Sequence, residues 1–212
     1  MKDIIEFFKK NYLLFIIIIC LIITCLILED VYKNEILEFD KLAYNLFKIR
    51  TPLLTKIFLI ITNLGSPYIL IFLTILSYFI KNKKISLSIT SNLILITIIN
   101  QLLKIIIKRP RPSELFLITE TGYSFPSGHS MVSLSFYGLL IYFIYKYLKN
   151  KKLKIFLITI LSLIIFLIGI SRIYLGVHFV SDVLAGFLLS VSYLIIYIKI
   201  INKFIFKENY EK

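Results

Sequence analysis

The sequence contains two histidines, His129 and His178, the side chains best suited to proton transfer and nucleophilic attack near neutral pH. Asp182 follows His178 by four residues, a spacing that places both side chains on one face of a helix. A carboxylate that accepts a hydrogen bond from one ring nitrogen fixes the tautomer and leaves the other nitrogen free as a nucleophile or base. Alone, such a histidine is more often structural and such an aspartate is usually a helix cap.

His129 lies in the stretch F-P-S-G-H-S at 125–130. Ser127 followed by Gly128 at a predicted helix start offers a capping hydroxyl and free backbone N–H groups, which bind anions with the help of the helix dipole. Gly128 has no side chain to keep a ligand from the backbone. An ordinary helix cap explains Ser127 by itself, but it does not explain a titratable histidine in the first turn.

Basic residues accompany both histidines. If a helix continues through K-I-I-I-K-R-P-R-P at 104–112, then Lys104, Lys108 and Arg111 lie on one face. Each cation alone is equally explained as a side chain that snorkels at the end of a membrane span. The two prolines then stop the helix and restrict the arginines. The cations concerned are Lys104, Lys108, Arg109, Arg111 and Arg172.

Fixed cations beside a Ser-Gly helix start suit a tetrahedral oxyanion such as phosphate, to which arginine offers forked donors. Metal catalysis is poorly supported, because the sequence has no HExxH motif, no cluster of carboxylates and no cysteine pair with ligand spacing. The pattern therefore predicts phosphoryl transfer to a histidine, with Lys, Arg and backbone donors stabilising the transition-state charge. Charges are expensive near a membrane, so separate structural explanations for all of these residues are unconvincing.

The composition indicates which elements carry these residues. Of 212 residues, 58% are hydrophobic and 17% are charged, whereas a soluble domain has about a quarter charged residues. This excludes disorder and predicts a membrane protein. Cys20 and Cys25 lie in one apolar run and are expected to pack as small apolar residues rather than to form a disulfide scaffold. The net charge of +13 would indicate nucleic acid in a soluble protein, but membrane topology explains it better, and no nucleic-acid partner is predicted.

Six transmembrane helices are predicted from apolar segments near the necessary length of about 20 residues. The second is expected to enter near Ile60, after an interfacial piece from Thr51, and to bend around Gly65 and Pro67. The fourth extends at its start over 128–130. The predicted spans are 12–28, 54–80, 85–107, 131–145, 153–170 and 179–198.

Residues 36–47 are predicted to form a short amphipathic helix on the membrane surface. Its apolar face would hold Ile36, Leu37, Ala43, Leu46 and Phe47, opposite Glu38, Asp40 and Lys41.

Charge then orients the chain. With six spans, the side that holds both termini carries 15 of the 25 basic residues and four of the 12 acids. The positive-inside rule predicts cytoplasmic termini and places the histidines on the extracytoplasmic side.

The three stretches together resemble the type 2 phosphatidic acid phosphatase superfamily of membrane lipid phosphate phosphatases. Its pattern is K-x6-R-P, then P-S-G-H, then S-R-x5-H-x3-D. The match covers residues 104–182, and the pattern of spans extends the likeness over most of the chain. The resemblance implies one integral-membrane phosphatase domain over 1–212, an all-α bundle of about six transmembrane helices with the interfacial helix after the first span. The matching residues are Lys104, Arg111-Pro112, Pro126 to His129, Ser171-Arg172, His178 and Asp182.

The resemblance also implies roles. His178 attacks phosphorus and forms a phosphohistidine, Asp182 orients His178, and His129 protonates the leaving oxygen and then activates water. No metal or cofactor is implied. Residues implied to bind phosphate are Lys104, Arg111, Ser127, Gly128 and Arg172. Residues without a specific role are Lys108, Arg109 and Glu114, of which the two cations serve a general attraction of anions.

The same motifs occur in soluble vanadate-dependent haloperoxidases and acid phosphatases, but six spans favour a lipid phosphate in the bacterial cytoplasmic membrane. Bacterial members act on undecaprenyl diphosphate, phosphatidylglycerol phosphate, phosphatidate or lipid A phosphates. An outward-facing site favours undecaprenyl diphosphate, which is released on that side. A non-catalytic lipid or anion transporter is the alternative from another class, and the oligomeric state is left open.

Overall fold

The structure is a computed structural model that describes residues 2–33, 38–47, 50–112 and 116–207. All regular structure in these ranges is helical, which confirms the predicted all-α class. The helices are α1 (Lys2–Tyr32), α2 (Glu38–Leu46), α3 (Pro52–Asn63), α4 (Pro67–Ser77), α5 (Lys83–Ile107), α6 (Gly128–Tyr147), α7 (Lys151–Tyr174) and α8 (Val180–Phe204).

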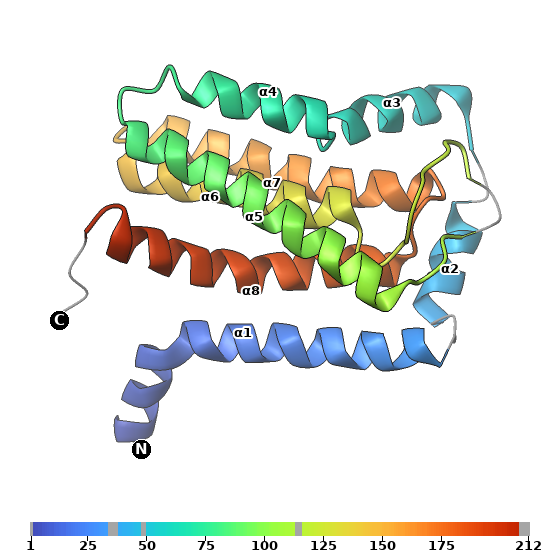
Figure 1. The fold of residues 1–212 in the computed structure, drawn as a ribbon, viewed down its shortest axis with the longest axis horizontal. Coiled ribbons are helices and arrows are strands. Elements are labelled where there is room, and N and C mark those ends of the chain that lie inside the picture. The colour runs from blue at the N-terminus through green and yellow to red at the C-terminus, as the bar shows by residue number, and fades with distance from the viewer. Residues whose placement is uncertain (1, 34–37, 48–49, 113–115, 208–212) are drawn as a thin grey trace.

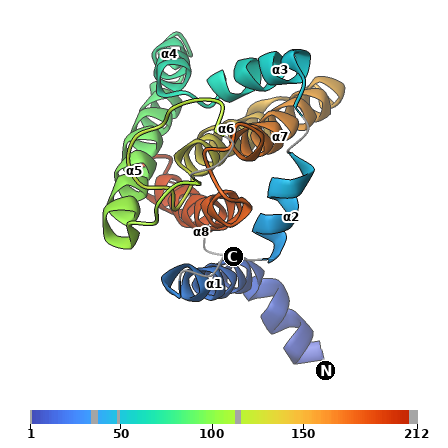
Figure 2. The same ribbon diagram turned by 90° about the vertical axis from the view of Figure 1, so that its right-hand side faces the viewer.

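The long helices run side by side, and α2 lies across one end of the bundle (Figure 1). Helix α6 packs against α5, α7 and α8, while α1 packs on α8, α3 on α7 and α4 on α5. Figure 2 shows α1 at one edge of the bundle and α4 at the opposite edge. The start of α1 and the end of α8 lie at the end away from α2 (Figure 1).

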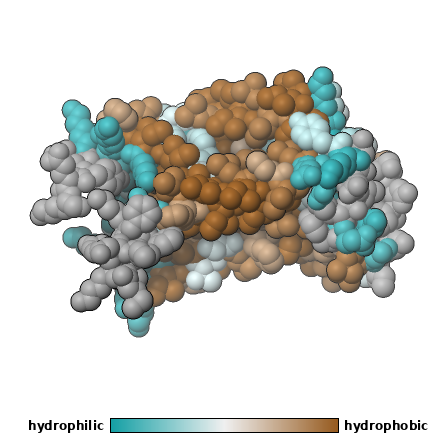
Figure 3. All heavy atoms as spheres, turned by 90° about the horizontal axis from the view of Figure 1, so that it is seen from below, coloured by the Kyte–Doolittle hydropathy of each residue, from teal (hydrophilic) through white to brown (hydrophobic). Residues whose placement is uncertain are grey.

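Within the described ranges, five helices are long and apolar enough to cross a membrane, and the pair α3 and α4 makes six if it forms one bent span. The spans are α1 from Asn11 onward, α5, α6, α7 and α8. Apolar side chains cover the middle of the face seen in Figure 3, with hydrophilic residues toward both ends. The chain is therefore an integral membrane protein, as its composition predicts.

The second predicted span is broken where Gly65 and Pro67 indicate, with a bend of 43° between α3 and α4. Helix α3 begins at Pro52, where the sequence predicts an interfacial piece from Thr51, and it ends at Asn63. Thr51 caps it by accepting a hydrogen bond from the Leu54 N–H at 3.3 Å, and proline suits the first helical position because its missing N–H needs no partner there.

Helix α5 ends at Ile107, so the prediction that Lys104, Lys108 and Arg111 share one helical face is wrong. Lys108 adopts a left-handed conformation, with φ of 54°, and its N–H bonds to the Lys104 carbonyl. The prolines at 110 and 112 then prevent a return to helix. As a result, Lys104 stays on the helix while the following arginines are aimed by an irregular segment.

Helix α2 confirms the position of the short helix but not its predicted faces, and Ile36 and Leu37 lie outside the described residues. Asp40 is buried at 3% exposure, whereas Leu46 is 67% exposed. The reason is that Asp40 finds buried polar partners, the Ser181 backbone N–H at 2.8 Å and the Ser181 hydroxyl at 2.6 Å. Helix α2 therefore turns a carboxylate toward the bundle and docks on α8.

Helix α8 approaches the start of α6 closely at Gly186. A methyl group there would lie 3.0 Å from the Ser127 carbonyl oxygen and 3.3 Å from the Met131 backbone nitrogen. Backbone atoms cannot rotate away as a side-chain end can, so glycine is required for this contact. The contact fixes the F-P-S-G-H turn against α8.

We expect Gly186→Ala to lower the free energy of unfolding by roughly 1–3 kcal/mol, because the added methyl overpacks a backbone contact. Thermal unfolding in detergent measures this loss. Gly138→Ala is the matched control in α6, since its methyl meets only side-chain atoms of Leu194 and Leu134. Equal losses in the two variants would contradict the backbone-contact explanation.

Candidate active site

His178 lies between helices, after α7 ends at Tyr174 and before α8 begins at Val180. The prediction that His178 and Asp182 share one helix face is therefore wrong in its geometry, although the two side chains do meet. Asp182 stands in the first turn of α8 and accepts the Phe179 backbone N–H at 2.9 Å, while its Oδ2 lies 3.4 Å from His178 Nδ1.

Ser124 completes the surroundings of Nδ1. Its hydroxyl lies 3.2 Å from His178 Nδ1 and donates a hydrogen bond to Asp182 Oδ2. These partners assign the ring proton to Nδ1. The other nitrogen, Nε2, keeps its lone pair and lies 3.2 Å from Arg111 Nη1. An imidazole oriented in this way can act as a nucleophile, and a cation lies beside its free nitrogen. Ser124 was not predicted, since a serine between two motifs carries no spacing signal.

Burial lowers the pKa of His178 to about 4, and the opposing effect of Asp182 only partly offsets it. The side chain is 2% exposed, and a charged imidazole loses its hydration there. The ring is therefore neutral at physiological pH, the state that a nucleophile requires.

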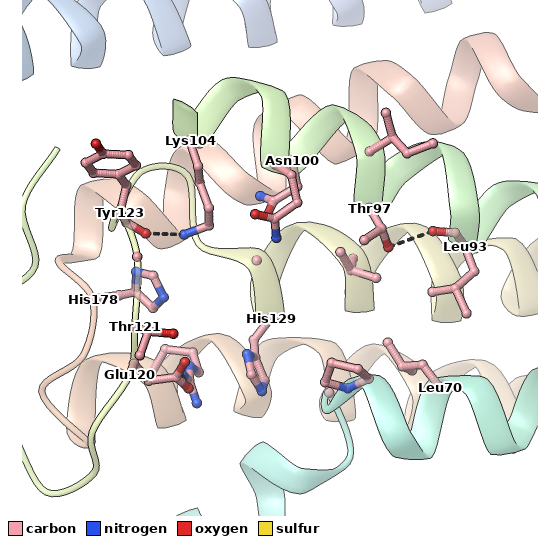
Figure 4. A pocket seen from close by; sticks show the side chains of 18 of the residues that line it. Leu70, Leu93, Thr97, Asn100, Lys104, Glu120, Thr121, Tyr123, His129 and His178 are labelled. Carbon is pink, nitrogen blue, oxygen red and sulfur yellow. Dashed lines mark hydrogen bonds and ion pairs between the residues drawn. The ribbon is translucent and has the colours of Figure 1, made fainter. Parts of the chain in front are cut away.

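His129 stands in the first turn of α6 and faces the same cavity as His178 (Figure 4). The break between α3 and α4 borders it, because a methyl group at Gly65 would lie 3.2 Å from His129 Cδ2 and 2.7 Å from Ser133 Oγ. The helix break thus brings a backbone without a side chain against the imidazole, which holds His129 toward the cavity.

Ser127 does not form the helix cap that the sequence predicts. Its hydroxyl makes no capping bond and instead accepts from Ser130 Oγ at 3.0 Å. Its backbone N–H donates to the Asp182 carbonyl at 3.0 Å, so that donor is not free for an anion. Ser127 is fully buried and joins the turn to α8. Gly128 does line the cavity, where a methyl would lie 3.1 Å from Asn100 Oδ1.

Three predicted cations, Lys104, Arg111 and Arg172, line the cavity. Lys104 Nζ donates to the carbonyl of Tyr123 (Figure 4) and also to the carbonyl of Ser124. Arg111 donates hydrogen bonds of 2.9–3.1 Å to the backbone carbonyls of three residues, which lie on two separate segments. The carbonyls that Arg111 contacts belong to Thr121, Gly122 and Val177. The segment 120–124 is therefore held in place by the same cations that the sequence predicts to bind phosphate.

Arg172 is 1% exposed and donates to Thr62 Oγ1 at 2.7 Å and to Glu120 Oε1. Its Nε is buried and makes no hydrogen bond within the described structure, which leaves a donor for an added oxyanion. Glu120 also lies 4.0 Å from Arg111. Burial alone would raise the pKa of Glu120, but Arg172 and Arg111 hold it below the usual value. Glu120 escaped prediction because it lies in an irregular segment outside the motifs.

The cavity has a volume of about 800 Å³ and joins two chemically different ends. Its polar end holds both histidines and Lys104 (Figure 4), together with Arg111 and Arg172. Its apolar end runs between α4 and α5. The apolar lining includes Leu70, Ile71, Leu93, Ile94 and Ile98. Such a cavity suits an amphiphile with an anionic head and an apolar chain.

The remaining predicted residues lie apart from this cavity. Arg109 turns away from it toward Asp182 and Asp40, which corrects its assignment to general attraction of anions. Lys108 is exposed at the end of α5, and Glu114 lies outside the described residues. Across the described part of the chain, no three His, Cys, Asp or Glu side chains gather as a metal site requires.

This chain is similar in sequence to known proteins. The model of the PAP2 superfamily matches residues 66–206. Phosphatidylglycerophosphatase B of Bacillus subtilis is 38% identical over 147 residues, covering 66% of this chain and 71% of the relative.

Two solved structures are also similar. The crystal structure of a transmembrane PAP2 type phosphatidylglycerolphosphate phosphatase from Bacillus subtilis has a TM-score of 0.80 and 30% identity, and the match covers 89% of this chain and 96% of that chain. The crystal structure of Aquifex aeolicus LpxE has a TM-score of 0.63 and 30% identity, and the match covers 76% of this chain and 93% of that chain.

The neutral state of His178 is testable because replacing His129 leaves one histidine in the chain. In His129→Gln with isotope-labelled histidine, we expect ring-nitrogen chemical shifts of the neutral, Nδ1-protonated tautomer at about pH 5.5. At that pH an unperturbed ring would be about 90% protonated, as the same sample must show after denaturation. A protonated ring in the folded protein would contradict the assignment.

We expect Glu120→Gln to bind inorganic phosphate more tightly, by roughly threefold, because a partly exposed ion pair of ~0.7 kcal/mol no longer competes for Arg172. Isothermal titration calorimetry measures the dissociation constant. Glu38→Gln is the matched control, since it removes an acid from an exposed ion pair on α2. Weaker phosphate binding in Glu120→Gln would show instead that the carboxylate holds Arg172 in its binding position.

Proposed function

Because this chain belongs to the PAP2 superfamily and is a lipid phosphatase, we propose that it removes the terminal phosphate of undecaprenyl diphosphate through a phosphohistidine on His178. Family membership also decides against the alternative of a lipid or anion transporter. The observation that carries the mechanism is the placement of His178, with Nδ1 held by Asp182 and Ser124 and Nε2 beside Arg111.

The reaction needs two displacements at phosphorus. His178 Nε2 attacks the terminal phosphorus and a P–N bond forms. The bond from that phosphorus to the bridging oxygen breaks, His129 gives its proton to this oxygen, and undecaprenyl phosphate leaves. Water then attacks the phosphohistidine while His129 takes a proton, the P–N bond breaks, and inorganic phosphate leaves. Water is the only reactant consumed besides the lipid phosphate. His178 and His129 therefore return to their starting protonation states.

The cations supply the electrostatic part of catalysis. Negative charge on the transferring phosphoryl group meets Lys104, Arg111 and Arg172, together with the backbone N–H groups at the start of α6. The anionic phosphate also favours the protonated form of His129 that the first step requires. Asp182 stabilises the positive charge that develops on His178 as Nε2 forms its bond.

The apolar lining between α4 and α5 supports a substrate whose tail stays in the membrane. The excess of basic residues at the end that holds the start of α1 and the end of α8 supports cytoplasmic termini and an extracytoplasmic site. That orientation favours undecaprenyl diphosphate. Phosphatidylglycerol phosphate is the second candidate, because the 38% identical relative is a phosphatidylglycerophosphatase B.

Purified protein in detergent, given a chelator, should release phosphate from a panel of lipid phosphates, with the highest kcat/KM for undecaprenyl diphosphate. The panel also includes phosphatidylglycerol phosphate and phosphatidate. His178→Gln should lower kcat by about a thousandfold or more, because no nucleophile of similar placement remains. Loss of activity with the chelator would contradict the metal-free mechanism, and a preference for phosphatidylglycerol phosphate would reassign the substrate.

A further inference from the structure

Arg109 is buried at 7% exposure although its neighbour Lys108 is exposed. Its Nη1 lies 2.6 Å from Asp182 Oδ1 and 2.7 Å from Ser181 Oγ. His178 faces the other carboxylate oxygen, Oδ2. Arg109 thus binds the half of the carboxylate that His178 leaves available, and this fixes the rotation of the carboxylate plane.

The guanidinium is itself held from the opposite side. Its Nη2 lies 3.4 Å from Asp40 Oδ2, and its carbon lies 4.1 Å from the centre of the Phe179 ring. Asp40 also accepts both the N–H and the hydroxyl of Ser181. Helix α2 therefore supplies a buried anchor that keeps Arg109 aimed at α8, with the ring stacked on its face.

Arg109 reaches the nucleophile by a second route through its backbone. Its carbonyl accepts the Ser124 N–H at 2.8 Å, and the Ser124 hydroxyl lies between His178 Nδ1 and Asp182. One residue therefore places both partners of Nδ1, the carboxylate through its side chain and the hydroxyl through its main chain.

The charges of this network also matter for the reaction. Asp40 and Asp182 are buried at 3% and 0% exposure, and Arg109 lies between them. Two buried carboxylates without a cation repel each other, and one would take up a proton. A protonated or rotated Asp182 cannot accept the Nδ1 proton when His178 becomes positive.

We propose that Arg109, anchored by Asp40 of α2, is a positioning residue that keeps Asp182 ionised and aimed at His178 during attack on phosphorus. It touches no substrate, because its guanidinium points away from the cavity into the contact between α2 and α8. The inference rests on the proposed function, in which His178 is the nucleophile and Asp182 its partner.

The test is a double-mutant cycle with Arg109→Lys and Asp182→Asn, in the full chain in detergent with a lipid phosphate as substrate. Lysine keeps the charge but not the fork that spans Asp40, Ser181 and Asp182. Arg109→Lys should lower kcat roughly tenfold to a hundredfold, with KM within about threefold of wild type, since phosphate contacts are intact. In the Asp182→Asn background the same change should lower kcat by less than about threefold.

Arg50→Lys is the matched control. It makes the same substitution at an arginine that lies over the Tyr174 ring and donates to the Phe47 carbonyl, so kcat should stay within about twofold. If Arg109→Lys does not fold, Asp40→Asn takes its place in the double-mutant cycle. It removes the anchor while leaving the guanidinium, and its loss of kcat should also shrink in the Asp182→Asn background.

The outcomes separate the inference from the proposed function. Turnover retained in His178→Gln would overturn the proposed function itself. With His178→Gln inactive, full additivity of Arg109→Lys or Asp40→Asn with Asp182→Asn, or a loss confined to KM, would overturn the positioning role. Loss of kcat that disappears without Asp182 supports it, because a generally structural role would persist in that background.

Discussion

The close contact between His178 Nδ1 and the Asp182 carboxylate is the interaction on which the rest of the site depends. Both side chains are almost fully buried at one end of a membrane-spanning bundle, where an unpaired charge is costly. Each buried charge around the pair must therefore have a partner. This requirement explains why Ser124 and Arg109 surround Asp182, and why α2 brings in Asp40.

The architecture meets this requirement with irregular segments rather than with regular helix. Helix α5 ends before the left-handed Lys108 and the prolines that follow it. Beyond this end, Arg109 and Arg111 point in different directions. The Arg109 side chain contacts Asp182, and the Arg111 side chain contacts Nε2 of His178. Two arginines separated by one residue thus make different contacts, one with Asp182 and the other with the free ring nitrogen of His178.

The membrane explains the shape of the cavity. Its polar end holds charges that pair with one another and with backbone carbonyls, and its apolar end is lined by α4 and α5. A lipid phosphate can place its head among the cations while its chain stays in an apolar environment. The break between α3 and α4 also shapes this cavity, because Gly65 lets the chain pass close to His129.

The sequence by itself determined the class of fold, the order of the long apolar helices and the set of motif residues, because apolar length and short spacings are local properties. The tertiary structure alone decided which cations line the cavity and which one contacts Asp182. It also revealed Glu120 and the Asp40 anchor. Their partners are 52 and 69 residues away. Such contacts depend on how helices pack and how an irregular segment is aimed, and no local pattern encodes either.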